Sequence, residues 1–345
     1  IVNSLDNRIM VRINVIGVTA EIIGAIIIIV LLLTHADHSP TITFHTGIPG
    51  SAFGALLVAA FAAAYVLIGF DSAGELSEET NNPQAVAPRT ILSAVGAAGV
   101  LGGLIIFTGL LAAPSLTDGR LAAEGLSYVL TSTLGDWLGK VLLADVVVAI
   151  VVATMAIQTS ATRMLFSMAR DGVVPFSRLL AKVSPRTGMP TGTVLVTGVL
   201  SAVIVAINFA SPDAFLAIGT TCIVLLYIAY VMVTVPLLRQ RLRGTWRGGA
   251  PGGTDANGKP LFSLGRWGLP VNVLAVVYGV GMAINLAWPR MEVYAPASHK
   301  WYFQWFTVLF VVAAVVLGVV YRWWSGRSQQ PAGELVESGQ PAAKA

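Results

Sequence analysis

Cysteine and charged residues are both scarce in this chain of 345 residues. Charged residues make up 11% of it, whereas about a quarter of an ordinary soluble domain is charged. The one cysteine, Cys222, excludes an intrachain disulfide and any metal site built from several thiolates, and its place in an apolar run predicts a buried, inert thiol. Disulfide-stabilised domains and cysteine-based zinc domains are therefore excluded.

Motifs for cofactor or metal chemistry are lacking as well. The sequence has no Walker-type phosphate loop and no Cys and His pair at metal-ligand spacing. His35, His38 and His45 fall in one predicted loop, where a weak metal site is the alternative to an ordinary polar loop. We expect no cofactor and no metal. The net charge of +4 does not indicate nucleic-acid binding, because the basic residues are confined to particular loops.

Long apolar segments, by contrast, are abundant. Hydrophobic residues make up 55% of the chain, and its mean hydropathy is +0.77. Eight segments are long enough to cross a bilayer as helices, at about 11–33, 52–72, 91–113, 139–165, 190–210, 214–238, 268–288 and 302–323. They predict an all-α polytopic membrane protein. We expect residues 1–324 to form a single transmembrane domain and residues 325–345 to form a disordered cytoplasmic tail.

The distribution of lysine and arginine predicts the orientation in the membrane. If residue 1 lies in the cytoplasm, all of the 21 lysines and arginines fall on the cytoplasmic side except Arg120, Lys140, Arg290 and Lys300. Loops enriched in Lys and Arg stay in the cytoplasm. We therefore expect both termini of this chain to be cytoplasmic, as an even number of spans requires.

The second apolar segment contains a candidate helix break. Residues 69–74 (GFDSAG) combine two glycines, a hydroxyl and a carboxylate after a long apolar run. Irregular backbone within a bilayer survives only where it lines a cavity or is buried in protein. Interrupted helices form the binding sites of many secondary transporters. The alternative is that the span simply ends at Gly69 and that the carboxylates belong to a loop at headgroup level.

Two longer motifs around this break and further along the chain resemble one family. GFDSA at 69–73 is followed by Glu75, EET at 78–80, NP at 82–83 and PR at 88–89. This pattern is similar to the sixth helix of amino acid permeases of the amino acid–polyamine–organocation (APC) superfamily. SATRMLFSMARDG at 160–172, with Pro175, resembles the end of their eighth helix. With the helix pattern, the resemblance covers nearly the whole chain.

The resemblance implies a leucine-transporter-like fold of inverted repeats, with twelve helices in most members. Because the second span here resembles the sixth helix, the chain is expected to contain helices 5 to 12 and to lack helices 1 to 4. No glycine-rich break of the kind expected for the first helix precedes residue 52. We therefore expect an N-terminally truncated portion of a longer protein, which would not transport by itself.

The same resemblance places the substrate at the break. The implied substrate-binding residues are Tyr65, Ile68, Gly69, Phe70, Asp71 and Ser72. The carbonyls of residues 68–70 would face the substrate amino group, and Tyr65 would serve as an aromatic gate, with ordinary packing as its alternative. Asp71 would bind an ammonium group or carry a proton. Its alternative role is to cap the following half-helix, whose N-terminus favours negative charge.

A second set of residues is expected to form the coupling-ion site and the gate. An ionisable side chain within a span costs about 2.5–3.5 kcal/mol on insertion scales and indicates function by default. Glu21 and Asp71 meet this criterion, and the resemblance adds Gln158, Thr159 and Ser160 as cation ligands, or else as helix-packing hydroxyl groups. Glu75, Arg163 and Arg170 are the implied gate, with snorkelling as the arginines' alternative. Asp145 is expected at the membrane interface.

These features predict a secondary active transporter in the plasma membrane. It would move an amino acid or related amine, such as GABA, choline or a polyamine, by alternating access, coupled to protons or else to sodium. GRWGLPVN at 265–272 and WPRMEVY at 288–294 favour the choline, GABA and amino-acid permease branch. Partners are the substrate, the coupling ion and the lipid bilayer. The rivals are a non-transporting membrane sensor or subunit and an integral membrane enzyme, but the intramembrane carboxylates sit singly on different predicted helices.

Overall fold

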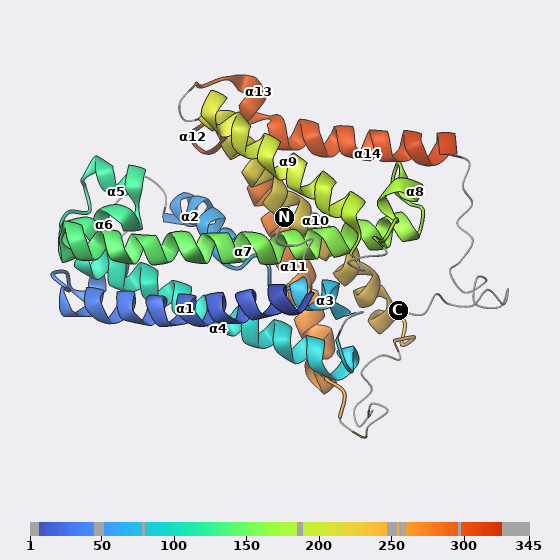
Figure 1. Cartoon of the computed structure of the whole chain (residues 1–345), viewed down its shortest axis with the longest axis horizontal. Helices are drawn as coiled ribbons and strands as arrows, with labels where there is room; N and C mark the ends of the chain where they lie inside the picture. The colour runs from blue at the N-terminus through green and yellow to red at the C-terminus, as the bar shows by residue number, and fades with distance from the viewer. Residues whose placement is uncertain are drawn as a thin grey trace. The chain divides into compact units, whose positions relative to one another are not determined.

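The computed structural model describes residues 7–44, 52–77, 80–184, 189–246, 254, 258, 260–295 and 298–325. Its long helices are α1 (Asn7–Thr34), α2 (Ala52–Val66), α4 (Pro83–Ala112), α7 (Asp136–Arg170), α9 (Thr191–Ala210), α10 (Pro212–Leu242), α11 (Gly268–Ala287) and α14 (Phe306–Ser325) (Figure 1). The short helices are η2 (Pro40–Phe44), α3 (Ser72–Glu75), α5 (Gly119–Glu124), α6 (Leu126–Leu134), α8 (Ser177–Leu180), η4 (Gly265–Trp267), α12 (Met291–Tyr294) and α13 (Trp301–Gln304). No strand occurs among these residues. The predicted tail lies outside the described residues, except for Ser325.

The helices confirm the all-α polytopic class. Within the described residues, seven helices are long and apolar enough to cross a membrane. The predicted second span is the exception, because its helix α2 has 15 residues and ends at Val66 rather than near residue 72. The break in this segment therefore begins earlier than the glycine pattern predicted.

Several other helix boundaries also differ from those expected from hydropathy, as three examples show. α4 begins at Pro83 instead of residue 91, because proline at the first helical position is favourable and the polar first turns need no apolar environment. α7 continues to Arg170, five residues beyond the predicted end. The last predicted span divides at Trp305 into α13 and α14. Hydropathy detects the lipid-facing part of a helix and not its polar ends.

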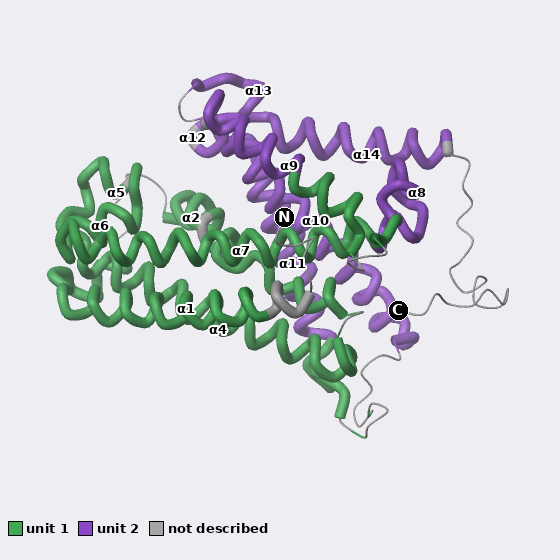
Figure 2. Tube along the Cα trace, viewed as in Figure 1, with its two compact units in different colours: residues 1–166, 182–198, 247–268 green, residues 167–181, 199–246, 269–345 purple. Residues whose placement is uncertain are grey.

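The chain divides into two compact units (Figure 2). Unit 1 comprises residues 1–166, 182–198 and 247–268. Unit 2 comprises residues 167–181, 199–246 and 269–345. Each unit combines segments that are distant in the sequence, so neither is a simple half of the chain.

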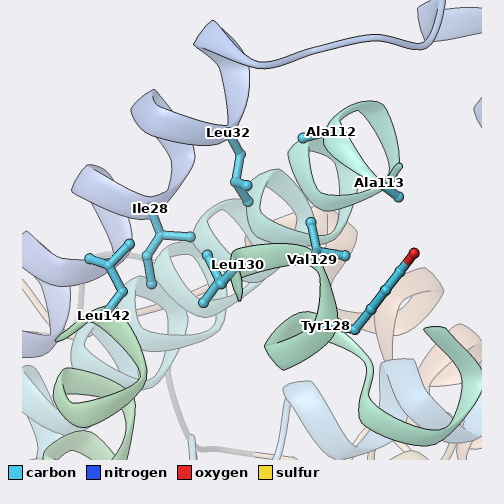
Figure 3. Packing of buried hydrophobic residues seen from close by; sticks show 8 residues of the cluster. All are labelled: Ile28, Leu32, Ala112, Ala113, Tyr128, Val129, Leu130 and Leu142. Atoms are coloured by element: carbon cyan, nitrogen blue, oxygen red, sulfur yellow. The ribbon is translucent and has the colours of Figure 1, made fainter. Parts of the chain in front are cut away.

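Unit 1 is built around α1, α4, α6 and α7. α1 packs along α4, and the ends of these helices enclose α6 (Figure 1). Their shared core contains the buried residues Ile28, Leu32, Ala112, Ala113, Tyr128, Val129, Leu130 and Leu142 (Figure 3). Lipid tails are as apolar as these side chains, so close packing rather than the hydrophobic effect stabilises such contacts within the bilayer.

Glycines allow close approach between helices in unit 1. An added Cβ at Gly17 would lie 2.4 Å from Val152, so α1 and α7 touch there. A Cβ at Gly102 would lie 2.8 Å from Val66, whereas one at Gly103 would meet nothing within 4 Å. The closest approach of α4 to the end of α2 is therefore at Gly102.

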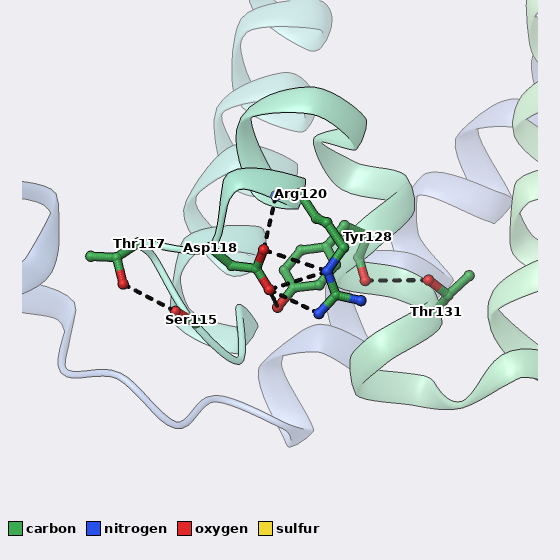
Figure 4. A network of polar contacts seen from close by, with 6 residues as sticks. All are labelled: Ser115, Thr117, Asp118, Arg120, Tyr128 and Thr131. Carbon is green, nitrogen blue, oxygen red and sulfur yellow. Dashed lines mark hydrogen bonds and ion pairs between the residues drawn. The ribbon is translucent and has the colours of Figure 1, made fainter.

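A polar network joins the segment before α5 to α6 (Figure 4). Asp118 caps α5, because its Oδ1 accepts a hydrogen bond of 2.9 Å from the backbone N–H of Arg120. The Arg120 guanidinium donates to Oδ2 at 2.8 Å and lies 4.8 Å from the ring centroid of Tyr128. The buried Tyr128 hydroxyl donates to the same oxygen at 3.1 Å. One carboxylate thus organises this connection.

Unit 2 is organised around α10, which packs against α12, α13 and α14. Ser211 caps α10 by accepting from the N–H of Ala214, and Pro212 occupies the first turn. The Thr221 and Thr307 hydroxyls lie 2.8 Å apart and join α10 to α14. Cys222, on the same helix, is exposed, so the prediction of a buried thiol was wrong: apolar neighbours in a membrane helix do not imply burial in protein.

Candidate functional site

The candidate site begins where the α2 helix stops. Residues 67–71 are non-helical, and Gly69 has a φ of +94°, a conformation that side chains other than glycine rarely adopt. The Gly69 carbonyl accepts from the N–H of Ser72 at 3.3 Å. The Ile68 carbonyl accepts no hydrogen bond within the described residues. Of the expected backbone ligands, Ile68 therefore presents an available acceptor, and Gly69 provides the turn.

The two other polar positions at the break lie at its end. Asp71 and Ser72 are half-buried, and Asp71 directly precedes α3. The Asp71 side chain makes no capping hydrogen bond to α3, so the capping alternative is not the arrangement in this structure. Tyr65, in the last turn of α2, is 51% exposed. The carboxylate of Asp71 is thus available for another partner.

The structure brings the break next to α7. Ser160 of α7 is buried, with 4% of its surface exposed, and its hydroxyl interacts with the Glu75 carboxyl at the end of α3. Ser160 Oγ nevertheless has no hydrogen bond of standard geometry within the described residues. Burial raises the pKa of Glu75; the Ser160 hydroxyl partly offsets this effect, and the negative charge of Asp71 adds to it. A predicted gate residue and a predicted ion-site residue therefore lie together.

The neighbouring positions on α7 are held by contacts within unit 1. The Thr159 hydroxyl is buried and donates to the Met155 carbonyl of its own helix at 2.9 Å. The Gln158 side chain lies against α9, 3.3 Å from the position of an added Cβ on Gly198. Thr162, also buried, lies 3.3 Å from the Thr197 hydroxyl. Gln158 and Thr162 thus lie against α9, whereas the Thr159 hydroxyl bonds within α7.

The two arginines assigned to the gate lie further along α7. The Arg163 guanidinium is 3.9 Å from the sulfur of Met189, just before α9. Arg170 is exposed in the last turn of α7, where a positive charge is favourable at a helix C-terminus. Glu78 and Glu79, the other acidic residues of the motif, lie outside the described residues. Glu75 is therefore the motif carboxylate whose surroundings are defined.

A second acidic pair lies between α1 and α7. Glu21 and Asp145 are close enough to interact electrostatically. An added Cβ on Gly24, one turn beyond Glu21, would lie 1.8 Å from Asp145 Oδ2, so this glycine makes room for the carboxylate. Two ionisable residues on different helices therefore lie near one another.

Sequence reasoning missed Asp145 as a partner of Glu21. Asp145 was expected at the membrane interface because it lies near one end of the predicted 139–165 span. The signal that would have found it is the rule that any ionisable residue within a span indicates function. A small residue one turn from the intramembrane Glu21 was a second signal, although it does not identify the partner.

The described residues contain no cluster of side chains that could bind a metal ion. Among the residues that the structure describes, no three His, Cys, Asp or Glu side chains gather as a metal site requires. His38 Nε2 donates to the Ala113 carbonyl at 2.9 Å, and His35 Nδ1 to the Leu31 carbonyl at 2.9 Å. His45 lies outside the described residues. The two described histidines of this loop therefore serve local structure.

The seven apolar candidate spans among the described residues define a multi-pass membrane protein. The family model for amino acid permeases matches residues 1–319. The chain therefore belongs to the amino acid permease family, within the APC superfamily that its motifs resemble.

The relatives of the chain include amino-acid permeases of fungi and plants. A permease of Schizosaccharomyces pombe is 24% identical over 330 residues, which cover 92% of this chain and 55% of the relative. Amino-acid permease BAT1 of Arabidopsis thaliana is 29% identical over 236 residues, or 65% of this chain and 43% of the relative. Amino-acid permease 2 of Neurospora crassa is 24% identical over 304 residues, with shares of 85% and 53%. The chain spans about half the length of the curated relatives it matches.

Proposed function

We propose that this chain is part of a secondary active transporter that moves an amino acid or related amine across the plasma membrane by alternating access, coupled to protons. Membership of the amino acid permease family supports the substrate class. The observation that carries the proposal is the helix break after Val66. α2 has 15 residues, which span about 22 Å at 1.5 Å per residue, less than the roughly 30 Å of a hydrocarbon core. The break then falls at membrane depth.

The chemistry of the break suits a substrate with an ammonium group. The Ile68 carbonyl lacks a hydrogen-bond donor among the described residues, and a carbonyl oxygen is an acceptor for an ammonium N–H. Asp71 adds a carboxylate that does not cap α3, so it can offset a positive charge. Glu75 and Ser160 continue the polar surface towards α7. An amino acid or amine would bind here through its amino group.

Glu21 and Asp145 are the proposed proton-coupling pair. Two carboxyl groups that interact within a membrane resist carrying two negative charges, so binding of one proton or one cation relieves their repulsion. Coupling requires that this occupancy differ between the conformations of the transporter. The pair lies on α1 and α7, and α7 also carries Ser160 next to the break. One helix thus connects the two polar groups.

The test uses the full-length protein reconstituted into liposomes. Uptake of a labelled panel of amino acids and amines is measured with and without an inward proton gradient. The variants are Asp71→Asn, Glu21→Gln and Asp145→Asn, and the control is Glu124→Gln, which removes an exposed carboxylate in α5. We expect gradient-driven uptake in the wild type and in the control. Asp71→Asn should lower uptake, on the order of tenfold, as expected for an intramembrane charge that binds substrate.

Glu21→Gln and Asp145→Asn should leave uptake that no longer responds to the gradient. Uptake that ignores the gradient in the wild type as well would contradict proton coupling and favour sodium or exchange. Absence of uptake of every compound by folded wild-type protein would contradict transport and favour the sensor reading. Gradient-driven uptake in both carboxyl variants would remove the pair from the coupling mechanism.

A further inference from the structure

The C-terminal end of α10 carries positive charges without acidic neighbours. Arg239, Arg241 and Arg243 lie in its last turn and at its end, and the sequence has no Asp or Glu between Asp213 and Asp255. The candidate span ends at Leu242, so these arginines lie at the level of the lipid headgroups. Within the described residues, their side chains form no ion pair and no hydrogen bond. The Nε atom of Arg241 is buried and has no hydrogen-bond partner among the described residues.

The arginine side chains are not needed to cap α10, because backbone N–H groups already donate to the carbonyls at its C-terminal end. The N–H of Thr245 donates to the Gln240 carbonyl at 3.0 Å, and the N–H of Gly244 donates to the Arg241 carbonyl at 3.1 Å. These two bonds, with Gly244 at a φ of +66°, form a Schellman motif. The Arg239 carbonyl accepts from the N–H of Arg243 at 3.1 Å. The guanidinium groups therefore remain available to an external acceptor.

The same turn returns the chain so that Trp246 meets Arg241. The guanidinium carbon lies 5.5 Å from the centroid of the Trp246 ring, within the range of a cation–π interaction. Trp246 is itself 41% exposed. Tryptophan prefers the interface between hydrocarbon and headgroups. The ring holds Arg241 in place and marks the depth at which its N–H groups lie.

The surface directly below the arginines is apolar and exposed. Leu242, Met232 and Val233 of α10 are each about 70% exposed. A ligand that has both a phosphate and acyl chains would contact the arginines and this surface together. A free phosphate would use the arginines alone, so the combination favours a lipid.

We propose that the C-terminal end of α10 binds the phosphates of anionic phospholipids, one through Arg239 and Arg243 and another through Arg241, with Trp246 beside the second headgroup. Arg239 and Arg243 are four residues apart and share one side of the helix end, while Arg241 and Trp246 lie on another. Guanidinium groups match phosphate oxygens in a bidentate geometry. This inference goes beyond the proposed transport function and does not depend on the substrate or on the coupling ion.

Native mass spectrometry of the full-length protein in detergent tests the proposal. Dioleoyl-phosphatidylglycerol and dioleoyl-phosphatidylcholine are titrated separately, and the retained lipids are counted. The test variant is Arg239→Gln/Arg241→Gln/Arg243→Gln. The control removes three exposed positive charges elsewhere, as Lys140→Gln/Arg178→Gln/Lys300→Gln. A third variant, Arg239→Lys/Arg241→Lys/Arg243→Lys, keeps the charge. Inorganic phosphate serves as a competitor.

We expect the wild type and the control to retain phosphatidylglycerol in preference to phosphatidylcholine. The glutamine variant should retain fewer phosphatidylglycerol molecules and bind them roughly 5- to 25-fold more weakly, about fivefold for each arginine that contacts a phosphate. Equal binding by the glutamine variant and the wild type would overturn the proposal, as would a wild type that does not distinguish the two lipids. Displacement of the lipid by an equal concentration of inorganic phosphate would show a free-anion site instead. If the glutamine variant does not fold, the lysine variant decides: tighter or equal binding relative to arginine would overturn the bidentate role.

Discussion

Single carboxylates in this chain have opposite surroundings. Asp118 lies in the loop before α5 and receives hydrogen bonds from Arg120 and Tyr128. Glu21 lies within a span and faces another carboxylate, Asp145. The first arrangement stabilises a negative charge and contributes to the fold. The second places two carboxyl groups near one another within the spans, which is typical of a site and not of a structural contact.

The Asp118 network predicts a pH dependence of stability. Hydrogen bonds from the Arg120 side chain and backbone lower the pKa of Asp118 from its ordinary value of 3.8 to about 2. A lowered pKa in the folded state stabilises the protein above the unfolded pKa, and this contribution is lost as the pH falls towards about 2. Asp118→Asn should therefore lower Tm at pH 7, and the Tm difference from wild type should shrink below about pH 3.8.

Thermal unfolding in detergent at a series of pH values from 7 to 3 measures this difference. Thr117→Ala is the control, because it removes the neighbouring hydrogen bond to Ser115 without removing a titrating group. Its effect on Tm should stay constant across the series. A Tm difference for Asp118→Asn that is also constant would show that the carboxylate charge does not stabilise the loop.

Among the elements, the interrupted segment from α2 to α3 depends on one backbone conformation. Gly69 turns the chain at a φ of +94°, and an added Cβ would meet nothing within 4 Å. Gly74, within α3, also has open space around an added Cβ but has no positive φ. Because neither position is crowded, comparing substitutions at the two glycines isolates the effect of backbone strain at Gly69.

Gly69→Ala should destabilise the protein by about 1–3 kcal/mol, because alanine is strained at this φ. It should also lower uptake, since the turn positions the Ile68 carbonyl and Asp71. Gly74→Ala should change stability by no more than about 1 kcal/mol and leave uptake near that of the wild type, because alanine is favourable in a helix. Thermal unfolding and liposome uptake of both variants measure this. Equal loss in the two variants would mean that the conformation of Gly69 is not what matters.

For the whole molecule, the asymmetric placement of lysine and arginine predicts which side of the membrane each loop faces. Glu124 and Arg120 lie in α5, before the long α7, and Arg178 lies in α8 after it. α7, of 35 residues, separates the two positions. They are therefore expected on opposite sides of the membrane whichever way the chain is inserted.

Labelling of single cysteines tests this orientation. In a Cys222→Ser background, which removes the one native thiol, Glu124→Cys should react with a membrane-impermeant maleimide in intact cells. Arg178→Cys should react only after the cells are permeabilised. Both substitutions are at exposed positions, so access to the reagent is set by the membrane. The reverse pattern would invert the predicted topology, and labelling of both in intact cells would contradict α7 as a span.

Much of the fold could be predicted from the local sequence. The errors arose because hydropathy reports only on neighbouring residues. The spans at α9 and α11 were predicted within one residue at each end, because an apolar run bounded by turn residues must satisfy its backbone within its own helix. The short helices α5 and α6 were missed, since α6 is amphipathic and buried against α1 and α4 instead of crossing the membrane. The α2 end was predicted too late, because hydropathy does not register the turn at Gly69.

The candidate site was likewise only partly predictable from the sequence. Glu21 and Asp71 were identified because each is ionisable within a predicted span, and Glu75 and Ser160 were identified by the resemblance of their motifs to the permease family. Spans and family can be recognised from the local sequence, since both depend on residues close together in the chain. The pairing of Glu21 with Asp145 and of Glu75 with Ser160 joins residues far apart in the sequence. Such pairs exist only once helices pack, so tertiary structure alone decided which polar residues lie together.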